Sequence, residues 1–113
     1  LKSSDPTFNK FGEVYFSIIK FNKIKAWKKH QKITLNLIVP FGNVEFVLIS
    51  NKGKYEKYLI GEDNYRRLTI PPQTWFGFKG IHSPKSIITS IIDFVHDPNE
   101  VEKKDIKYFD YKW

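Results

Sequence analysis

The feature that most constrains the fold is a pattern of short segments in which apolar and polar residues alternate, separated by turn-forming residues. The alternation is clearest in residues 33–39 and returns in residues 44–50. A period of two is typical of a strand with one buried face. Pro40 and Gly42 lie between these segments, and proline ends a strand ladder whereas glycine accepts a positive φ. We therefore expect the two strands to form a hairpin.

Further segments are rich in β-branched and aromatic residues, which is the composition of strands. They span residues 14–21, 24–27, 55–60, 68–70, 74–81 and 86–94. The last, rich in isoleucine, is expected to be buried on both faces. After it, Asp97, Pro98 and Glu100 form a capping-box arrangement that predicts a short helix through about Lys104. About seven short strands and one small helix predict an all-β fold, an antiparallel sandwich or barrel.

The length of 113 residues predicts a single domain over residues 1–113. Residues 1–11 are polar and are expected to be a loosely ordered lead-in. The aromatic tail at residues 108–113 is expected to pack on the barrel or on a second subunit. No apolar run approaches the roughly 18–20 residues of a membrane span, and no signal-peptide pattern opens the chain. With no cysteines, the chain has neither disulfides nor thiol nucleophiles, and we expect a cytoplasmic protein.

The formal net charge of +7 indicates anionic partners, either nucleic acid, a phosphorylated small molecule or a membrane surface. The alternative is compositional drift toward lysine, because the only arginines are Arg66 and Arg67. Basic and aromatic residues also interleave in residues 25–28 and 75–79, a pattern that could stack single-stranded bases or hold the base and pyrophosphate of a nucleotide.

The alternative for these rings is a barrel interior filled with aromatic side chains. We assign Phe78 to the core. Trp27 and Trp75 follow charged or turn residues, so we expect them to line the mouth of the barrel.

The residues at the expected ligand positions argue against a metal site. Lys28 and His30 have the spacing of two residues that share one face of a strand. However, a protonated lysine repels a cation, Leu35 stands near the place of an acidic ligand, and Phe76 stands where another histidine would be needed. One ligand out of four cannot hold a divalent ion, so we expect no metal.

His30 is the histidine with the strongest claim to catalysis. Lys28, Lys29 and Lys32 surround it, and neighbouring cations favour the neutral imidazole, which is the form that a general base needs. The alternative is a solvated surface run of charged residues. His96 is expected only to stabilise the turn that follows it.

Several motifs together resemble the dTDP-4-dehydrorhamnose 3,5-epimerase family of the cupin superfamily, over about residues 12–113. They are Gly12-Glu13-Val14-Tyr15-Phe16-Ser17, Ile24-Lys25-Ala26-Trp27, Thr34-Leu35-Asn36, Gly61-Glu62-Asp63-Asn64-Tyr65, Ile70-Pro71-Pro72-Gln73-Thr74-Trp75-Phe76-Gly77-Phe78-Lys79-Gly80 and His96-Asp97-Pro98. The resemblance implies a cupin double-stranded β-helix, or jelly-roll barrel, and an epimerase that uses neither metal nor organic cofactor.

The resemblance also implies roles for individual positions. In such enzymes a histidine removes protons next to the 4-keto group of a deoxythymidine-diphosphate sugar, a tyrosine returns a proton from the other face, and a lysine steadies the enolate oxygen. The base position is Lys28 here, the tyrosine falls near Ser90, and the enolate lysine falls near Leu35. Lys25 stands where a basic residue meets the phosphates.

These departures leave two readings of function. In the first, the chain is a nucleotide-sugar epimerase or isomerase of cell-surface polysaccharide synthesis, with His30 or Lys28 as the base. Its substrate-binding residues are Lys25, Trp27, Trp75 and Phe76. In the second, it is a catalytically silent cupin that binds nucleotide-sugars or glycans. Single-stranded nucleic-acid binding is a weaker third reading.

The partner is expected to be a deoxythymidine-diphosphate sugar or a related anion. The protein is expected to be a homodimer, because barrels commonly cover an edge by pairing strands.

Overall fold

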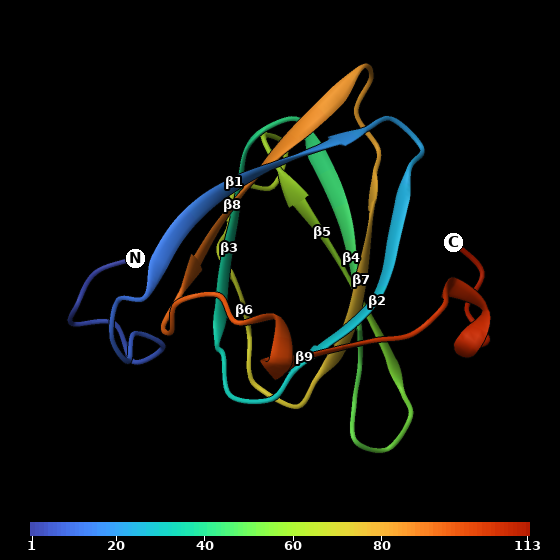
Figure 1. Ribbon diagram of the computed structural model, residues 1–113. Coiled ribbons are helices and arrows are strands. Elements are labelled where there is room, and N and C mark those ends of the chain that lie inside the picture. The colour runs from blue at the N-terminus through green and yellow to red at the C-terminus, as the bar shows by residue number, and fades with distance from the viewer.

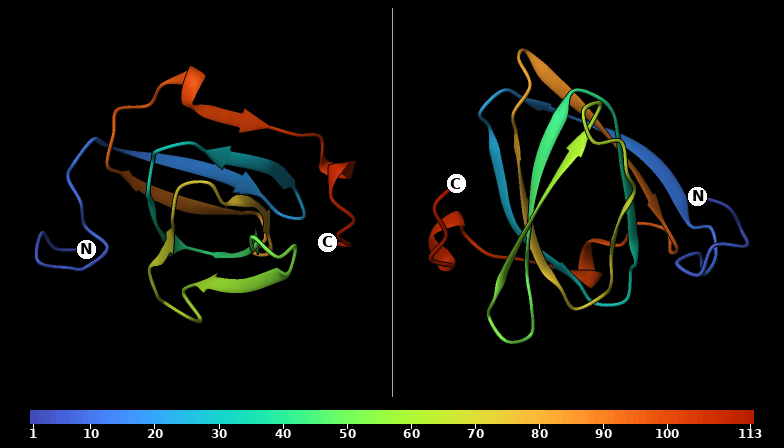
Figure 2. Two further views of the ribbon diagram at one scale, coloured as in Figure 1. Left: turned by 90° about the horizontal axis from the view of Figure 1, so that it is seen from below. Right: turned by 180° about the vertical axis from the view of Figure 1, so that it is seen from behind.

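Two antiparallel sheets face each other in the computed structural model, which describes residues 1–113 (Figures 1 and 2). The strands are β1 (Glu13–Lys20), β2 (Ile24–His30), β3 (Leu35–Phe41), β4 (Asn43–Ile49), β5 (Tyr55–Gly61), β6 (Leu68–Ile70), β7 (Trp75–Gly80), β8 (Lys85–Ile92) and β9 (Val101–Lys103). One sheet has the order β1-β8-β3-β6 and the other has the order β5-β4-β7-β2-β9. The predicted all-β class and cupin-like architecture are confirmed. No helix here has the length and apolar character needed to cross a membrane.

The predicted hairpin between β3 and β4 is wrong, because these strands belong to different sheets. Pro40 lies in an irregular part of β3, where the register against β8 shifts between Ile38 and Phe41. The chain then crosses to the other sheet through Gly42, which has a φ of +85°. A side chain would not fit there, because a Cβ at this position would lie only 2.3 Å from the Ser86 Oγ. β4 pairs instead with β5 and β7.

The isoleucine-rich strand β8 is buried on one face only, which corrects a second expectation. Ser86, Ile88, Ser90 and Ile92 point inward, whereas the alternate positions are only half-buried. β8 lies between β1 and β3 in the sheet, and the outer face of this sheet has no covering layer.

The expected C-terminal helix is replaced by a 3-10 turn and a strand. Asp97 does cap a turn, since its carboxylate accepts the Asn99 N–H at 3.0 Å, but the turn ends at Glu100. β9 then pairs with the free edge of β2, and that pairing satisfies more backbone groups than a one-turn helix could.

The core has an inner part and an outer part. Fourteen buried residues from both sheets fill the space between the sheets. On the outer side of the five-stranded sheet, Trp27 packs against the aromatic tail, with ring centroids 5.4 Å from both Phe109 and Trp113. Gly77 permits this approach, because a Cβ there would lie 3.0 Å from Trp113 and 3.1 Å from Trp27. The tail therefore packs on the barrel, which was one of the two places expected for it.

Candidate active site in the barrel cavity

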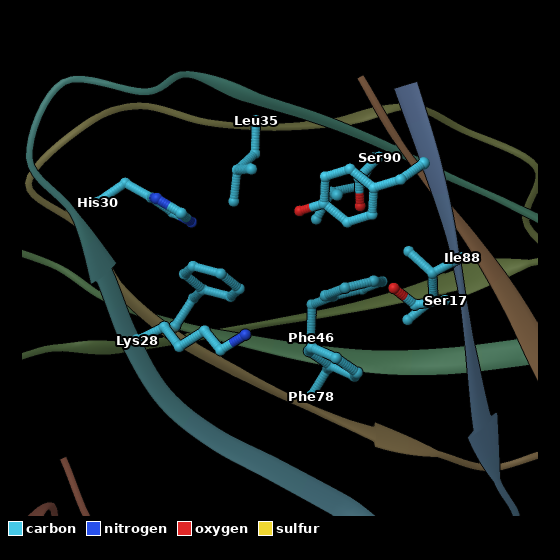
Figure 3. A pocket seen from close by; sticks show the side chains of 11 residues that line it. Ser17, Lys28, His30, Leu35, Phe46, Phe78, Ile88 and Ser90 are labelled. Carbon is cyan, nitrogen blue, oxygen red and sulfur yellow. The ribbon is translucent and has the colours of Figure 1, made fainter. Parts of the chain in front are cut away.

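A cavity of about 70 Å³ lies between the two sheets (Figure 3). It is lined by Tyr15, Ser17, Lys28, His30, Leu35, Leu37, Phe46, Phe76, Phe78, Ile88 and Ser90. Next to it is a wider space of about 340 Å³, to which His96, Pro98, Val101 and Lys103 contribute. Tyr15, Lys28 and His30 line both spaces, so these three side chains stand where the narrow interior meets the wider mouth.

Strand β2 places Lys28 and His30 on the cavity side. Alternate residues of a strand share a face, and Figure 3 shows both side chains directed into the same space. Lys29, between them, points outward: its Nζ lies 3.6 Å from a Glu102 carboxylate oxygen and 5.2 Å from the Trp75 ring centre. The run of basic residues is therefore divided between the two faces of the strand, with Lys28 and His30 on the cavity side and Lys29 on the outer side.

His30 is paired with Glu100, a residue seventy positions later in the chain. The two side chains are buried, with exposed fractions of 8% and 6%, and His30 Nδ1 is hydrogen-bonded to Glu100 Oε1. The other carboxylate oxygen, Oε2, accepts the backbone N–H groups of Lys32 at 3.0 Å and Ile33 at 3.2 Å. Burial alone would raise the pKa of Glu100, but the Lys32 N–H, His30 and the Ile33 N–H outweigh it and hold that pKa below its usual value.

The ionised Glu100 sets the tautomer of His30. A carboxylate without a proton can only accept hydrogen bonds, so Nδ1 carries the hydrogen and neutral His30 keeps a free lone pair on Nε2. The ring lies nearly parallel to Phe76, with centroids 6.2 Å apart and planes 19° apart. The expectation that lysines alone would set the state of His30 overlooked this carboxylate. Together, Glu100 and Phe76 orient an imidazole that can accept a proton from the cavity.

The ammonium group of Lys28 has an altered environment. Partial desolvation lowers its pKa, and the charges of Lys103 and Lys25 lower it further. The residue as a whole remains exposed, because the cavity is open. The desolvation therefore comes from protein atoms packed around the ammonium group and not from full burial of the side chain. Lys103 stands directly opposite Lys28 in the pairing of β2 with β9.

Tyr15 and Ser90 reach the cavity from the opposite sheet. They are directly paired between β1 and β8, and both line the interior. Burial raises the pKa of the Tyr15 hydroxyl; Ser90 opposes this rise and the Glu13 carboxylate adds to it. Tyr15 is therefore a protonated phenol at neutral pH, and it faces Lys28 and His30 across the space between the sheets.

Trp27 and Trp75 lie outside the cavity and its wider mouth, and Trp27 borders only the depression beside the mouth, so the expectation that both tryptophans line the mouth is wrong. Trp27 is 1% exposed under the tail, and Trp75 packs against Phe109 of the same tail with centroids 5.6 Å apart. Each precedes a cavity-lining residue, Lys28 and Phe76 respectively, and neighbours in a strand point to opposite faces. Phe76 lines the cavity, and its contact with a substrate stays a prediction.

Lys25 lies on the rim of the site. It borders a shallow depression beside the mouth, together with Ala26, Trp27, Lys28, Lys103 and Lys104. Leu35 lines the interior, where it adds to the apolar wall. No three or more histidine, aspartate or glutamate side chains come together in a group that could hold a metal ion.

Three residues of this site were not recognised as such from the sequence. The sequence predicts Glu100 only as a helix-capping residue, Tyr15 only as part of a strand and His96 only as part of a turn. The position of Tyr15 in the Gly12–Ser17 motif was a usable signal, because alternation puts it on the same face as Ser17. His96 is held by its backbone, whose N–H donates to Glu13 Oε1 at 2.6 Å.

Comparison with known proteins places this geometry in a family. No family model matches the chain. A solved dTDP sugar isomerase from Desulfovibrio desulfuricans G20 is 33% identical, with a TM-score of 0.93 over all of this chain and 78% of that one. The chain belongs to the dTDP-sugar epimerase and isomerase family of cupins. The resemblance noted from its motifs is confirmed, and the protein is an epimerase/isomerase-like nucleotide-sugar cupin.

More distant relatives share the fold. A dTDP-4-dehydrorhamnose 3,5-epimerase from Sulfolobus tokodaii is 22% identical, with a TM-score of 0.84 over 98% of this chain and 69% of that one. A sugar 3,4-ketoisomerase from Thermoanaerobacterium thermosaccharolyticum, solved in complex with TDP, is 16% identical, with a TM-score of 0.73 over 88% and 72%. The Haloferax volcanii protein named "Probable low-salt glycan biosynthesis epimerase Agl13" is 24% identical over 83% of this chain, which spans 65% of its length.

Proposed function

We propose that this cupin is an enzyme that epimerises or isomerises a dTDP-4-keto-6-deoxysugar for cell-surface polysaccharide synthesis. One observation supports the proposal most: Lys28 and His30 from one sheet face Tyr15 from the other sheet across a single cavity. Inverting a carbon next to a carbonyl requires a base on one side of the sugar ring and an acid on the other.

Each side chain suits a part of this chemistry. His30 Nε2, or a neutral Lys28, accepts the proton from the carbon next to the keto group, and an enolate forms. The Tyr15 hydroxyl donates a proton to that carbon from the opposite face. The hydrogen bond to Glu100 holds the imidazole in the productive tautomer and stabilises the imidazolium that forms. Phe76 and Phe46 exclude water from the reacting atoms.

The rim of the site supports an anionic substrate. Lys25, Lys103 and Lys104 gather beside the mouth, and the whole chain carries a net charge of +7. Lysines bind phosphate as point charges, and a diphosphate at this rim would leave the sugar directed toward Lys28 and His30.

Deuterium exchange tests the proposal. The protein is incubated with dTDP-4-keto-6-deoxyglucose in deuterated water, and NMR follows the protons at C3 and C5. We expect deuterium at one or both carbons, together with an epimer or an isomer. The His30→Gln variant should bind dTDP as the wild type does but exchange about 10²–10⁴-fold more slowly.

A catalytically silent binding protein is the second candidate. It is favoured by the apolar Leu35 in the interior and by the open, lysine-rich mouth, since both suit binding better than turnover. Stabilisation by dTDP in a thermal-shift assay, with no exchange at either carbon, would support this candidate and contradict the enzyme.

A further inference from the structure

We propose that Lys28 acts as a covalent catalyst, forming an imine with the keto carbon of the sugar. This inference rests on the proposed function, because it concerns the same substrate in the same cavity. It assigns the amine a bond to the substrate rather than the role of a general base.

The position of Lys28 carries the inference. Its Nζ points into the cavity toward the rings of Phe46 and Phe78 (Figure 3). Lys103 is its direct partner across the β2–β9 pairing, and Lys25 lies on the same rim. An apolar wall and neighbouring cations are the two environments that favour the neutral, nucleophilic amine of a lysine. Lys28 has both.

Apart from Lys28 and His30, the interior of the cavity has no cationic side chain to stabilise an enolate. Apart from Lys28 and His30, the residues that line the interior are apolar or carry hydroxyl groups. No second ammonium or guanidinium group faces the interior to hold the negative charge of an enolate oxygen. An iminium removes that need, because it places a positive charge on the substrate itself and converts the carbanion into a neutral enamine.

The groups that line the cavity can supply and accept every proton in this sequence of steps. The neutral Lys28 Nζ attacks the carbonyl carbon, and the nitrogen proton passes to oxygen to give a carbinolamine. The hydroxyl takes a proton from protonated His30 and leaves as water, so that an iminium remains and His30 becomes neutral. Neutral His30 then removes the proton of the adjacent carbon and an enamine forms. Tyr15 then protonates that carbon and becomes a phenolate. Water attacks the iminium and gives its proton to the Tyr15 phenolate, and the carbinolamine collapses to the ketone and the free amine as its hydroxyl proton passes to nitrogen.

Reductive trapping tests the imine directly. The full chain is incubated with dTDP-4-keto-6-deoxyglucose and sodium cyanoborohydride, and intact-mass analysis follows the product. Reduction of the imine adds the mass of the sugar nucleotide less one oxygen atom. We expect one adduct per chain, located at Lys28 by peptide mapping and suppressed by excess dTDP.

Matched variants separate this adduct from random modification of surface lysines. Lys28→Met and Lys28→Arg should give no adduct at residue 28, and both should exchange deuterium at least about 10²-fold more slowly than the wild type. Lys29→Met is the control, because Lys29 faces outward from the same strand and should leave trapping unchanged. Circular dichroism confirms that each variant folds.

The outcomes distinguish the imine from the proposed function. A wild-type protein that exchanges deuterium but gives no adduct at Lys28 would overturn the imine and leave the epimerase intact. Deuterium exchange at the wild-type rate by Lys28→Arg would also overturn the imine and leave the epimerase intact, because arginine cannot form the imine. Failure of the wild type both to exchange and to form the adduct, despite binding dTDP, would overturn both proposals.

Discussion

Replacement of Glu100 by glutamine tests the part assigned to the His30–Glu100 pair. The carboxylate accepts hydrogen bonds from His30 Nδ1 and from the N–H groups of Lys32 and Ile33, at 3.0 and 3.2 Å. Glutamine keeps one oxygen for the backbone donors but turns an amide NH₂ toward the imidazole. One hydrogen bond to a charged group is lost, so we expect Glu100→Gln to lower the free energy of unfolding by about 1.5–3 kcal/mol. Glu100→Ala, which leaves buried donors unpaired, should lower it by about 3–5 kcal/mol.

The same change should alter catalysis more than stability. An NH₂ group facing Nδ1 favours the tautomer with its hydrogen on Nε2, and that tautomer cannot accept a proton from the cavity. Deuterium exchange into the sugar should therefore slow by about 10²–10⁴-fold in the folded Glu100→Gln variant. The ¹⁵N chemical shifts of the His30 ring should report the change of tautomer.

The contribution of Glu100 also depends on pH. Because its pKa is lowered in the folded state, the unfolded chain binds the proton more tightly, and stability is lost as pH falls through the folded pKa. The stability is fully present above the unfolded value, near 4.5. Urea titrations at pH 7 and pH 4 should show this loss in the wild type and a smaller loss in Glu100→Gln.

Glu102→Gln is the matched control for these measurements. Glu102 lies on the exposed part of β9, and its pairs with Gln31 and Lys29 are at the surface. Its replacement should change the free energy of unfolding by less than about 0.5 kcal/mol. Equal stability of Glu100→Gln and Glu102→Gln at pH 7, or an unchanged His30 tautomer in the former, would refute the reasoning about the buried pair.

Three further predictions concern single residues. Lys28→Met should raise the urea midpoint at pH 7, because a lowered lysine pKa means that folding disfavours the charged form; a lower midpoint would contradict the desolvation argument. Tyr15→Phe should retain deuterium exchange but lose inversion at the exchanged carbon, as read by NMR of the product; continued inversion would exclude Tyr15 as the acid. The predicted homodimer should pair through β1, and Phe16→Glu should then lower its mass in sedimentation experiments to that of a monomer, because Phe16 is 70% exposed on this edge strand, beside the exposed Val14 and Ile18. An unchanged mass would argue against pairing through this face.

The strands themselves could be read from the sequence, because alternation and turn residues act locally. The period of two placed Lys28 and His30 on one face, and it also contained the information that Trp27 and Trp75 face away from the cavity. That inference was missed because both tryptophans stand beside charged or turn residues, which resemble the lining of a mouth. Motif resemblance identified the family and its cupin architecture.

Only the tertiary structure decided which strands are neighbours and which distant groups meet. The segment through Pro40 and Gly42 looked like a hairpin turn, but it crosses between sheets, because a strand's partner depends on the whole sheet and not on the residues of one turn. Nothing near Glu100 in the sequence marks it as the partner of His30. The carboxylate reaches that histidine because β9 pairs with β2, and it stays ionised there because two backbone N–H groups and the imidazole compensate for its burial.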